Sequence, residues 1–329
     1  MSCKISRRSF LKVSGCLMLG SAVSGLLCGA GDPAEGGAAV PTVGGLRVNY
    51  VRAFAKDYGN NFRQMEIHLN IENTNSSAAY FNQENFVPLL GNSRYGGERT
   101  FAGLNKWNGS RYVQDVQLKA GETQTISYTC NLQPEDLSAG LRAVDPAPWS
   151  LTLLYGGQRQ TFTGYLLPDR YSTEYTAGPV ESTVLPSVGG IVLSGFWSSD
   201  FLTQVPSYDL PIYFTMQNSN DTAAQLPFRG VAENGDVLDN FTIRMDGQPR
   251  NHYRLYACTH TSRFTPEEKG HLETLQPQEI CFAETGISLT KDEYSTLYTT
   301  GHMLEITFSY GDESVTVRGN TRTGIFEAI

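Results

Sequence analysis

"IHLNIENTNSSAA", residues 67–79, returns as "IYFTMQNSNDTAA", residues 212–224, which lies 145 positions later (212 − 67 = 145). Each copy begins with apolar and polar residues in alternation, the period of a strand that buries one face. Ile67, Leu69 and Ile71 are therefore expected to point inward, and so are their matches in the second copy. The asparagines that follow favour a turn, because Asn tolerates left-handed backbone and bonds to its own turn. The same strand and the same turn are thus predicted twice.

Two more blocks repeat in the same order, which makes the chain a tandem duplication. Residues 118–137, "LKAGETQTISYTCNLQPEDL", match residues 275–294, "LQPQEICFAETGISLTKDEY". Residues 151–164, "LTLLYGGQRQTFTG", match residues 305–319, "EITFSYGDESVTVRG". These blocks lie 157 and 155 positions apart (275 − 118 and 319 − 164) rather than 145. The second copy therefore contains additional residues, which we assign to an insertion at 227–274.

The second and third blocks also predict local structure. "QPEDL" and "TKDEY" each predict one helical turn after a strand, and Thr290 with Glu293 forms a capping box at the start of the second turn. The last block predicts a hairpin in each copy. Its turn is Gly156-Gly157 in the first copy and Gly311-Asp312 in the second, and both pairs suit the primed turns that join antiparallel strands.

The short alternating segments, with turn residues between them and no long amphipathic helix, predict an all-β protein. Its length suits two domains of ordinary size. We expect a first β-sandwich at 46–170, a linker at 171–190 and a second β-sandwich at 191–329. Residues 31–45, rich in Gly, Ala and Pro, are expected to form a flexible tether.

This order of features resembles the immunoglobulin-like β-sandwich domains of many bacterial secreted and surface proteins. The resemblance covers most of residues 46–329. Its carriers are a strand ending in Asn-x-Asn, a turn followed by Glu, and a final Tyr-Gly hairpin. The Cys…Trp…Cys core of antibody domains is absent. The resemblance implies two antiparallel sandwiches in tandem, a fold used for binding modules, spacers and assembly parts.

The N-terminal segment 1–30 has the pattern of an export signal. The stretch "SRRSFLK", residues 6–12, resembles the twin-arginine signal. The matching residues are Arg7, Arg8, Phe10 and Leu11. The resemblance implies that the protein is exported after it has folded, whereas the alternative is a chance arginine pair in an ordinary secretory signal.

A lipid anchor is an alternative end for this segment. Cys28 lies where a lipoprotein cysteine would lie, but Leu27 precedes it where that pattern has a small residue. We therefore expect an extracellular or cell-envelope protein, with an anchor at Cys28 as the alternative. We expect no transmembrane domain in the mature protein, because the apolar run is short and rich in Gly and Ser.

The charge balance bears on the partners. The chain has a formal net charge of −8, and residues 46–329 hold 21 of the 25 Lys and Arg but 31 of the 33 Asp and Glu. Nucleic acid and acidic membrane surfaces attract clustered positive charge. This balance argues against both as partners.

Three cysteines follow the signal, at Cys130, Cys258 and Cys281. Cys258 and Cys281 lie in the same half, so one interpretation joins them in a disulfide. The other leaves them as buried thiols, because a protein that folds before export folds in a reducing cytosol. The sequence leaves the disulfide state of this pair open.

No strong catalytic or metal-binding motif occurs, and we expect no cofactor. The best candidate is "HTSRFTPEEKGH", residues 260–271, in which His260, Glu268 and His271 are candidate metal ligands. The alternative is a short helix capped by Thr265 and ended by Gly270.

Aromatic side chains form the other candidate site, a ligand surface. Its members are Trp107, Tyr112, Tyr253 and Tyr256, with Trp197 as a further ring. Flat rings stack on sugars, whereas the alternative is that these rings cap the sandwich ends or lie between the domains. Partner contacts are expected first in the insertion 227–274.

Together these features favour a non-enzymatic, exported binding or assembly module of the cell envelope, whose partner is a protein or a cell-surface polymer. Two alternatives stay open. One is a metal-dependent hydrolase centred on residues 260–271, and the other is a carbohydrate-binding module that uses the exposed rings.

Overall fold

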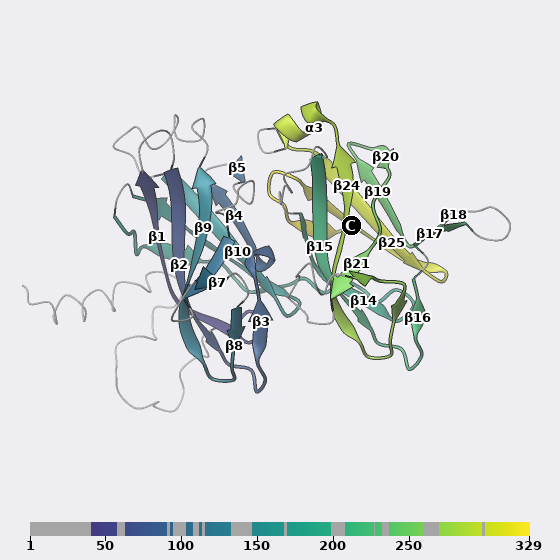
Figure 1. Cartoon of the computed structure of the whole chain (residues 1–329), viewed down its shortest axis with the longest axis horizontal. Helices are drawn as coiled ribbons and strands as arrows, with labels where there is room; N and C mark the ends of the chain where they lie inside the picture. Colours follow the sequence, from purple (N-terminus) through teal and green to yellow (C-terminus); the bar gives the residue numbers. More distant parts are fainter. Residues whose placement is uncertain are drawn as a thin grey trace, which may run out of the picture.

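The protein is almost entirely antiparallel β-sheet, as the sequence predicts (Figure 1). The computed structural model describes residues 41–57, 63–90, 93–94, 103–107, 112–113, 116–132, 147–167, 170–198, 208–226, 228–231, 237–258, 270–297 and 300–329. Strands from the first half of the chain form one group of sheets and strands from the second half form another.

The first half contains a five-stranded sheet and a six-stranded sheet. The first has the order β1 (Leu46–Asp57), β2 (Arg63–Asn73), β9 (Thr123–Leu132), β6 (Gly103–Trp107) and β7 (Tyr112–Val113). The second has the order β12 (Tyr175–Ala177), β11 (Gln158–Leu166), β10 (Ala147–Tyr155), β4 (Phe86–Leu90) and β5 (Ser93–Arg94), and its sixth strand, β13 (Glu181–Ser182), pairs with β11. A short pair, β3 (Ala79–Phe81) and β8 (Val116–Leu118), and the 3-10 turn η1 (Gln83–Asn85) complete this half.

The second half has the same layout. Its first sheet has the order β14 (Ile191–Ser198), β15 (Tyr208–Asn218), β24 (Ile280–Leu289), β21 (Tyr256–Cys258) and β22 (Gly270–His271). Its second sheet has the order β27 (Phe326–Ala328), β26 (Glu313–Asn320), β25 (Met303–Tyr310), β19 (Phe241–Met245) and β20 (Gln248–Arg250). The short pair is β16 (Ala224–Gln225) with β23 (Thr274–Leu275), and the helix α3 (Lys291–Thr296) follows β24.

The repeated strand occupies the same position in both halves. Ile67 on β2 lies between Ala53 and Tyr128. Ile212 on β15 lies between Ser198 and Thr285. The neighbours are displaced by 145 (198 − 53) and 157 (285 − 128) positions, the same separations that the sequence blocks show. The two predicted strands are therefore equivalent in topology and in register.

Each half encloses its own hydrophobic core between its two sheets. In the first half, Ile67 and Leu69 of β2 meet Leu151 and Phe162 of the opposite sheet, and all four are buried. The equivalent residues of the second half make the same kind of core. They include Ile212, Phe214, Phe241 and Phe308. This two-layer packing is the sandwich that alternating strands predict.

A further matching block begins each half, and it changes the expected end of the tether. Val43 is fully buried, so the expected tether 31–45 ends earlier, before this residue. Gly44 and Gly45 have positive φ (56° and 82°), and Gly189 and Gly190 repeat these values (55° and 79°). A Cβ on Gly44 would lie 2.7 Å from the carbonyl oxygen of Tyr155. Only glycine therefore permits this turn to pack on the final hairpin.

Another match between the halves shows that the additional residues of the second half are fewer than the predicted insertion 227–274. Asn85-Phe86 at the start of β4 corresponds to Asn240-Phe241 at the start of β19. Both asparagines donate to a carbonyl of the neighbouring strand, at Leu154 O and Ser309 O. Strands β19 to β23 within 227–274 thus take the places of β4 to β8. The hairpin of β17 (Phe228–Val231) and β18 (Val237–Asp239) has no counterpart among the described strands, so it is the additional element.

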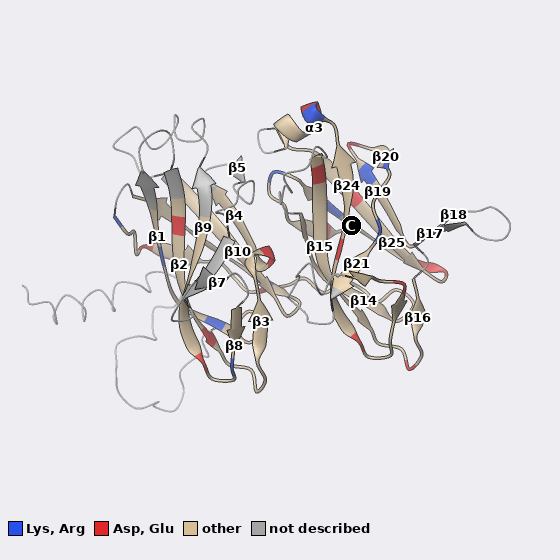
Figure 2. Ribbon diagram, viewed as in Figure 1, with Lys and Arg blue, Asp and Glu red and all other residues tan. Residues whose placement is uncertain are grey.

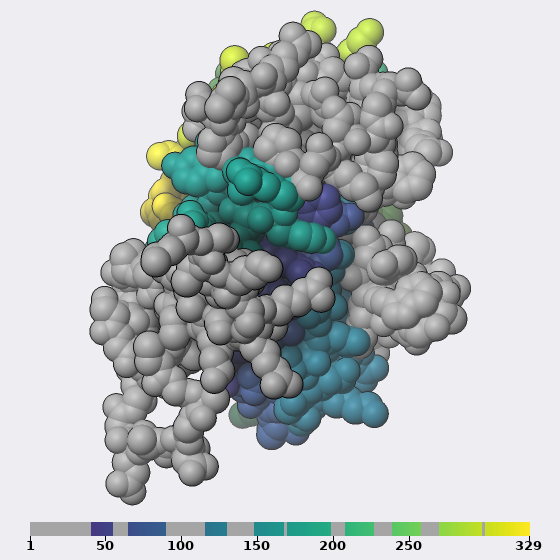
Figure 3. All heavy atoms as spheres, turned by 90° about the vertical axis from the view of Figure 1, so that its left-hand side faces the viewer, coloured from purple at the N-terminus to yellow at the C-terminus, as the bar shows by residue number. Residues whose placement is uncertain are grey.

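The segment 171–190 is not the free linker that its composition suggests. Ser172 pairs with Ala53 of β1, and β12 and β13 (Glu181–Ser182) both pair with β11. Val184 then pairs with Ser194 of β14. In Figure 3 teal atoms, the colour of the middle of the chain, lie against purple atoms from near the start of the described chain. The connection is therefore hydrogen-bonded to both halves.

Candidate functional site

Some of the candidate metal ligands and candidate ligand-binding rings lie in the part of the chain that the structure describes. His260 and Glu268 lie outside the described residues. Trp107 and Tyr112 are opposite each other on β6 and β7, but their side chains are not among those described. His271 is described and does not meet other ligands there, because the described residues contain no group of three His, Cys, Asp or Glu placed to hold a metal.

Five residues form a row across the first sheet of the second half. Backbone register places Trp197 opposite Tyr213, and Tyr213 opposite Glu284. It places Tyr256 opposite Glu284 on the other side, and His271 opposite Tyr256. Residues directly opposite each other share a face of a sheet. We call these five residues the aromatic row, and it lies on the outward face, away from Ile212 and the core.

One end of the aromatic row is covered by the first half of the chain. Trp197 and Tyr213 are 2% and 5% exposed. They pack with Phe282, Val87 and Leu154, and we call these five residues the junction cluster. The last two come from β4 and β10 of the first half. Trp197, one of the candidate rings for ligand contact, therefore lies between the halves, as the alternative interpretation predicts for it.

The other end of the row carries rings at the surface. Tyr256 is half-buried and stacks on the exposed His271, with ring centroids 4.5 Å apart. Tyr253 lies beside them, 6.2 Å from Tyr256 between centroids. The structure thus brings together Tyr253 and Tyr256, as the predicted ligand surface requires, and adds His271.

Glu284 lies between the two ends and is only 6% exposed. The hydroxyl of Tyr253 donates to its Oε1 at 2.8 Å. A Cβ at position 286 would lie 2.4 Å from that hydroxyl, so Gly286 is needed for the ring to lie across β24. Burial, together with the nearby carboxylates of Glu284 and Asp209, raises the pKa of Tyr253 well above its ordinary value. This face therefore carries negative potential next to aromatic rings.

The equivalent row of the first half is polar. Arg52, His68 and Ser127 occupy the places of Trp197, Tyr213 and Glu284. His68 faces outward, opposite in alternation to the buried Ile67 and Leu69. Its Nδ1 lies 3.2 Å from Arg52, its Nε2 lies 3.1 Å from Glu66, and Tyr171 packs against its ring at 5.2 Å. The aromatic row with its buried carboxylate is thus a feature of the second half, which the sequence repeat alone did not indicate.

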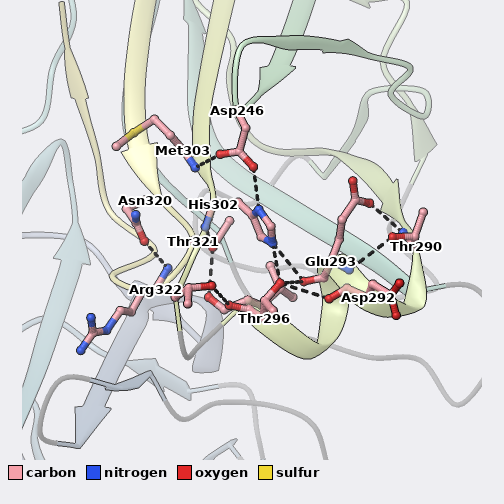
Figure 4. Close-up of polar contacts among 12 residues, drawn as sticks. Asp246, Thr290, Asp292, Glu293, Thr296, His302, Met303, Asn320, Thr321 and Arg322 are labelled. Atoms are coloured by element: carbon pink, nitrogen blue, oxygen red, sulfur yellow. Dashed lines mark hydrogen bonds and ion pairs between the residues drawn. The ribbon is translucent and has the colours of Figure 1, made fainter.

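A second polar cluster surrounds His302 (Figure 4). The His302 Nδ1 lies 2.7 Å from Asp246 Oδ2, and its Nε2 lies 2.9 Å from Thr296 Oγ1. This order of acid, imidazole and hydroxyl resembles a catalytic arrangement. However, Thr296 Oγ1 also donates to the carbonyl of Asp292 within α3, and His302 Nε2 lies 3.1 Å from the Glu293 carbonyl. The cluster therefore fastens α3 to the β19–β20 turn rather than presenting a nucleophile.

The carboxylates around α3 are held in their charged form. Although partial burial opposes it, hydrogen bonds from His302 and Met303 lower the pKa of Asp246. Burial likewise opposes a shift at Glu293, but its bonds to Thr290 and Arg250 lower its pKa. The capping box of Thr290 and Glu293 is present, as predicted.

His252 is a third polar contact and is buried (4% exposed). Its Nε2 lies 2.8 Å from Asp239 Oδ2 and 3.0 Å from the carbonyl of Phe241. Burial opposes protonation, but Asp239 and the neighbouring carbonyls raise the pKa of His252. The contact ties the end of β18 to β19, so its role is structural.

Other features bear on membranes and partners. None of the helices in the described ranges is long and apolar enough to cross a bilayer. Lys and Arg are few along the described ribbon and do not gather on one sheet (Figure 2).

Neither a scan of protein-family models nor a search of curated proteins finds a match for this chain.

Proposed function

We propose that the protein is an exported, non-enzymatic binding module of the cell envelope built from two immunoglobulin-like sandwiches. The strand orders support the fold part of this proposal. The sequence of neighbours β1-β2-β9-β6 in one sheet and β11-β10-β4 in the other corresponds to the ABED and GFC sheets of immunoglobulin folds. The second half repeats both orders.

The single observation that carries the binding role is the surface end of the aromatic row. Tyr253, Tyr256 and His271 stand together beside the buried carboxylate of Glu284. The framework of the first half is the same, yet it has Arg52, His68 and Ser127 in the places of Trp197, Tyr213 and Glu284. Such a difference between two copies of one framework is expected where one copy has specialised for recognition, since function resides in sites placed on a shared fold.

Export in the folded state agrees with how the sandwiches close. The amide of Gly44 donates to Gln158 Oε1 at 2.8 Å, across 114 residues of chain. Such distant contacts form slowly, and the cytoplasm gives the chain time to complete them before transport. We expect a precursor with Arg7 and Arg8 both changed to Lys to accumulate inside the cell. Undiminished export of that variant would contradict folded transport.

Binding is tested with insoluble cell-wall material and the purified protein. Tyr256→Ala should reduce co-sedimentation at least about fivefold, because a central aromatic anchor carries much of a binding surface. Tyr165→Ala is the matched control, since Tyr165 is a 55% exposed tyrosine of the first half. If the protein does not bind, or if both variants bind as the parent does, the proposed recognition surface is wrong.

A further inference from the structure

We propose that the outer edge of β1 is a docking site for residues 38–40 of this chain, which come directly before the described part of the first half. The site belongs to the first half and does not depend on the proposed binding function. Its model is the way in which the connector covers the equivalent strand, β14. There Val184 pairs with Ser194, and the amide of Leu185 donates to the carbonyl of Leu193 at 2.8 Å.

The corresponding edge of the first half has room for the same partner. β1 lies at the end of its sheet, as β14 does. Among the described residues, partners pair with the outer side of β1 only at Leu46 and at Ala53. Val48 lies between these two positions and is the equivalent of Leu193 (193 − 145 = 48), in the same register on the neighbouring strand. A sheet edge of this kind is a template for a further strand.

The sequence identifies the occupant. Residues 38–45, "AAVPTVGG", match residues 183–190, "TVLPSVGG", at the displacement of 145 positions (183 − 38) that the repeated strand shows. Four of the eight residues are identical, and the apolar Val40 stands where the connector has Leu185. The connector residues that cover β14 therefore have counterparts directly before Pro41.

The described part of this block has the same structure in both halves. Val43 pairs with Leu46, as Val188 pairs with Ile191. The glycine pairs that follow have matching positive φ angles. In each pair the second carbonyl accepts a bond from the amide of the residue after the buried asparagine, at 2.8 Å and 2.9 Å. The chain thus enters both halves along the same path, which places the residues before it at the same edge.

Local chemistry favours the docking. Val40 and Leu185 each precede a proline, a position that favours extended backbone. Leu185 is partly buried against the core of the second half, and Val48 is partly buried against the core of the first. In the docked segment the amide of Val40 would donate to the carbonyl of Val48. The expected tether would then end at residue 37, and any removal of the signal would have to leave residue 38 in place.

Hydrogen exchange of the purified full-length chain, read at single residues by mass spectrometry, tests the docking. We expect the amide of Val40 to exchange at least about tenfold more slowly than a free amide, because a bonded amide exchanges only after local opening. The amide of Leu185 is the internal standard. Val40→Asp should remove the protection at residue 40, since a charge is costly to pack against an apolar core. Ala34→Asp adds the same charge within the expected tether and should leave the protection unchanged.

Three results would overturn the proposal. Exchange of Val40 at the rate of a free amide would show that these residues do not occupy the edge. Protection that rises with protein concentration would show that a second copy supplies the strand. Equal effects of the two aspartate variants would argue against a specific contact. Circular dichroism of Val40→Asp should match the parent, so that lost protection at residue 40 reports undocking rather than unfolding.

Discussion

At the scale of single residues, Asn73 and Asn218 close one end of each sandwich with the same bonds. Both are fully buried. The Asn73 Nδ2 donates to the carbonyls of Ser77 and Leu118, and its Oδ1 accepts from the amide of Asn75. Asn218 makes the corresponding bonds 145 and 157 positions later. The buried polar network therefore requires an asparagine in both copies, because each polar group left unpaired there would cost about 1–3 kcal/mol.

One position of this network differs between the copies. Gly121 and Gln278 both donate a backbone bond to the carbonyl of the buried asparagine and both have positive φ, 73° and 61°. A side chain in this region is strained, whereas glycine is not. We expect Gly121→Ala to destabilise the protein by about 1 kcal/mol from backbone strain alone, because nothing lies within 4 Å of its Cβ position.

The reciprocal change serves as the comparison. Gln278→Gly should leave stability unchanged or raise it by up to about 0.5 kcal/mol, since relief of strain is offset by the loss of an exposed bond to Ser219. Denaturant unfolding of both variants measures the difference. If Gly121→Ala proved neutral, the strain argument would be wrong.

At the scale of elements, β2 and β15 show how one strand adapts to two environments. β2 alternates buried and partly exposed residues from Met65 to Asn73. β15 is buried without interruption from Leu210 to Phe214. Its outward residues lie under the junction, and a strand covered on both faces has a continuous apolar run. The sequence shows this difference, because β15 has "LPIYF" (210–214) where β2 has "MEIHL" (65–69).

The fastening of α3 predicts how the second half responds to acid. Asp246 and Glu293 have pKa values below their ordinary 3.8 and 4.5. A lowered pKa stabilises the fold above the unfolded value, and this contribution is lost as the pH falls through the folded value. We expect Asp246→Asn to cost about 1 kcal/mol at pH 7, because the side chain is half-exposed and screened.

The difference from the parent protein should shrink as the pH is lowered below about 4, since Asp246 itself becomes neutral there. Thermal unfolding across pH 2.5–7 measures it. Asp312→Asn, at the exposed β25–β26 turn, is the control and should show no such trend. A constant difference at every pH would argue that Asp246 acts through shape rather than charge.

At the scale of the whole molecule, an apolar patch joins the two halves where the structure describes them. The junction cluster joins Val87 and Leu154 to the rings of the second half. Arg159 adds ion pairs to Glu181 and Glu327, and the connector pairs with sheets on both sides. The equivalent outward face of the first half carries Arg52 and His68, and the ring of Tyr171 packs against both.

Separating the halves tests this packing. We expect Val87→Asp combined with Leu154→Asp to open the junction, because two buried carboxylates there would cost several kcal/mol. Both residues lie in the junction cluster and outside the core of the first half. Small-angle scattering should show a larger radius of gyration and unfolding should split into two transitions. Tyr165→Asp is the surface control, and an unchanged scattering curve for the double variant would contradict the rigid junction.

Most of the fold could be predicted from the repeats, because the sequence patterns that indicate strands, turns and caps are local. Alternation in "IHLNIEN", the turn pairs at Gly156 and Gly311, and the capping box at Thr290 each depend on a few neighbouring residues. These predict strands, hairpins and a helical turn without knowledge of distant contacts. The sequence did not predict the glycine turns at Gly44 and Gly189, because a glycine-rich composition is also typical of a flexible tether.

Only part of the candidate site could be predicted from the sequence, because its other residues come together through contacts between distant strands. Tyr253 and Tyr256 are close in the chain, and their rings were expected to share a surface. Glu284 and His271 join them only through strand register, across β24 and β22. Local alternation and turn chemistry are written along the chain, so the sequence alone was sufficient for two copies of one all-β framework. Which outward face is buried and which is left for a ligand depends on sheet register and on the contact between the halves, and these exist only once the chain has folded.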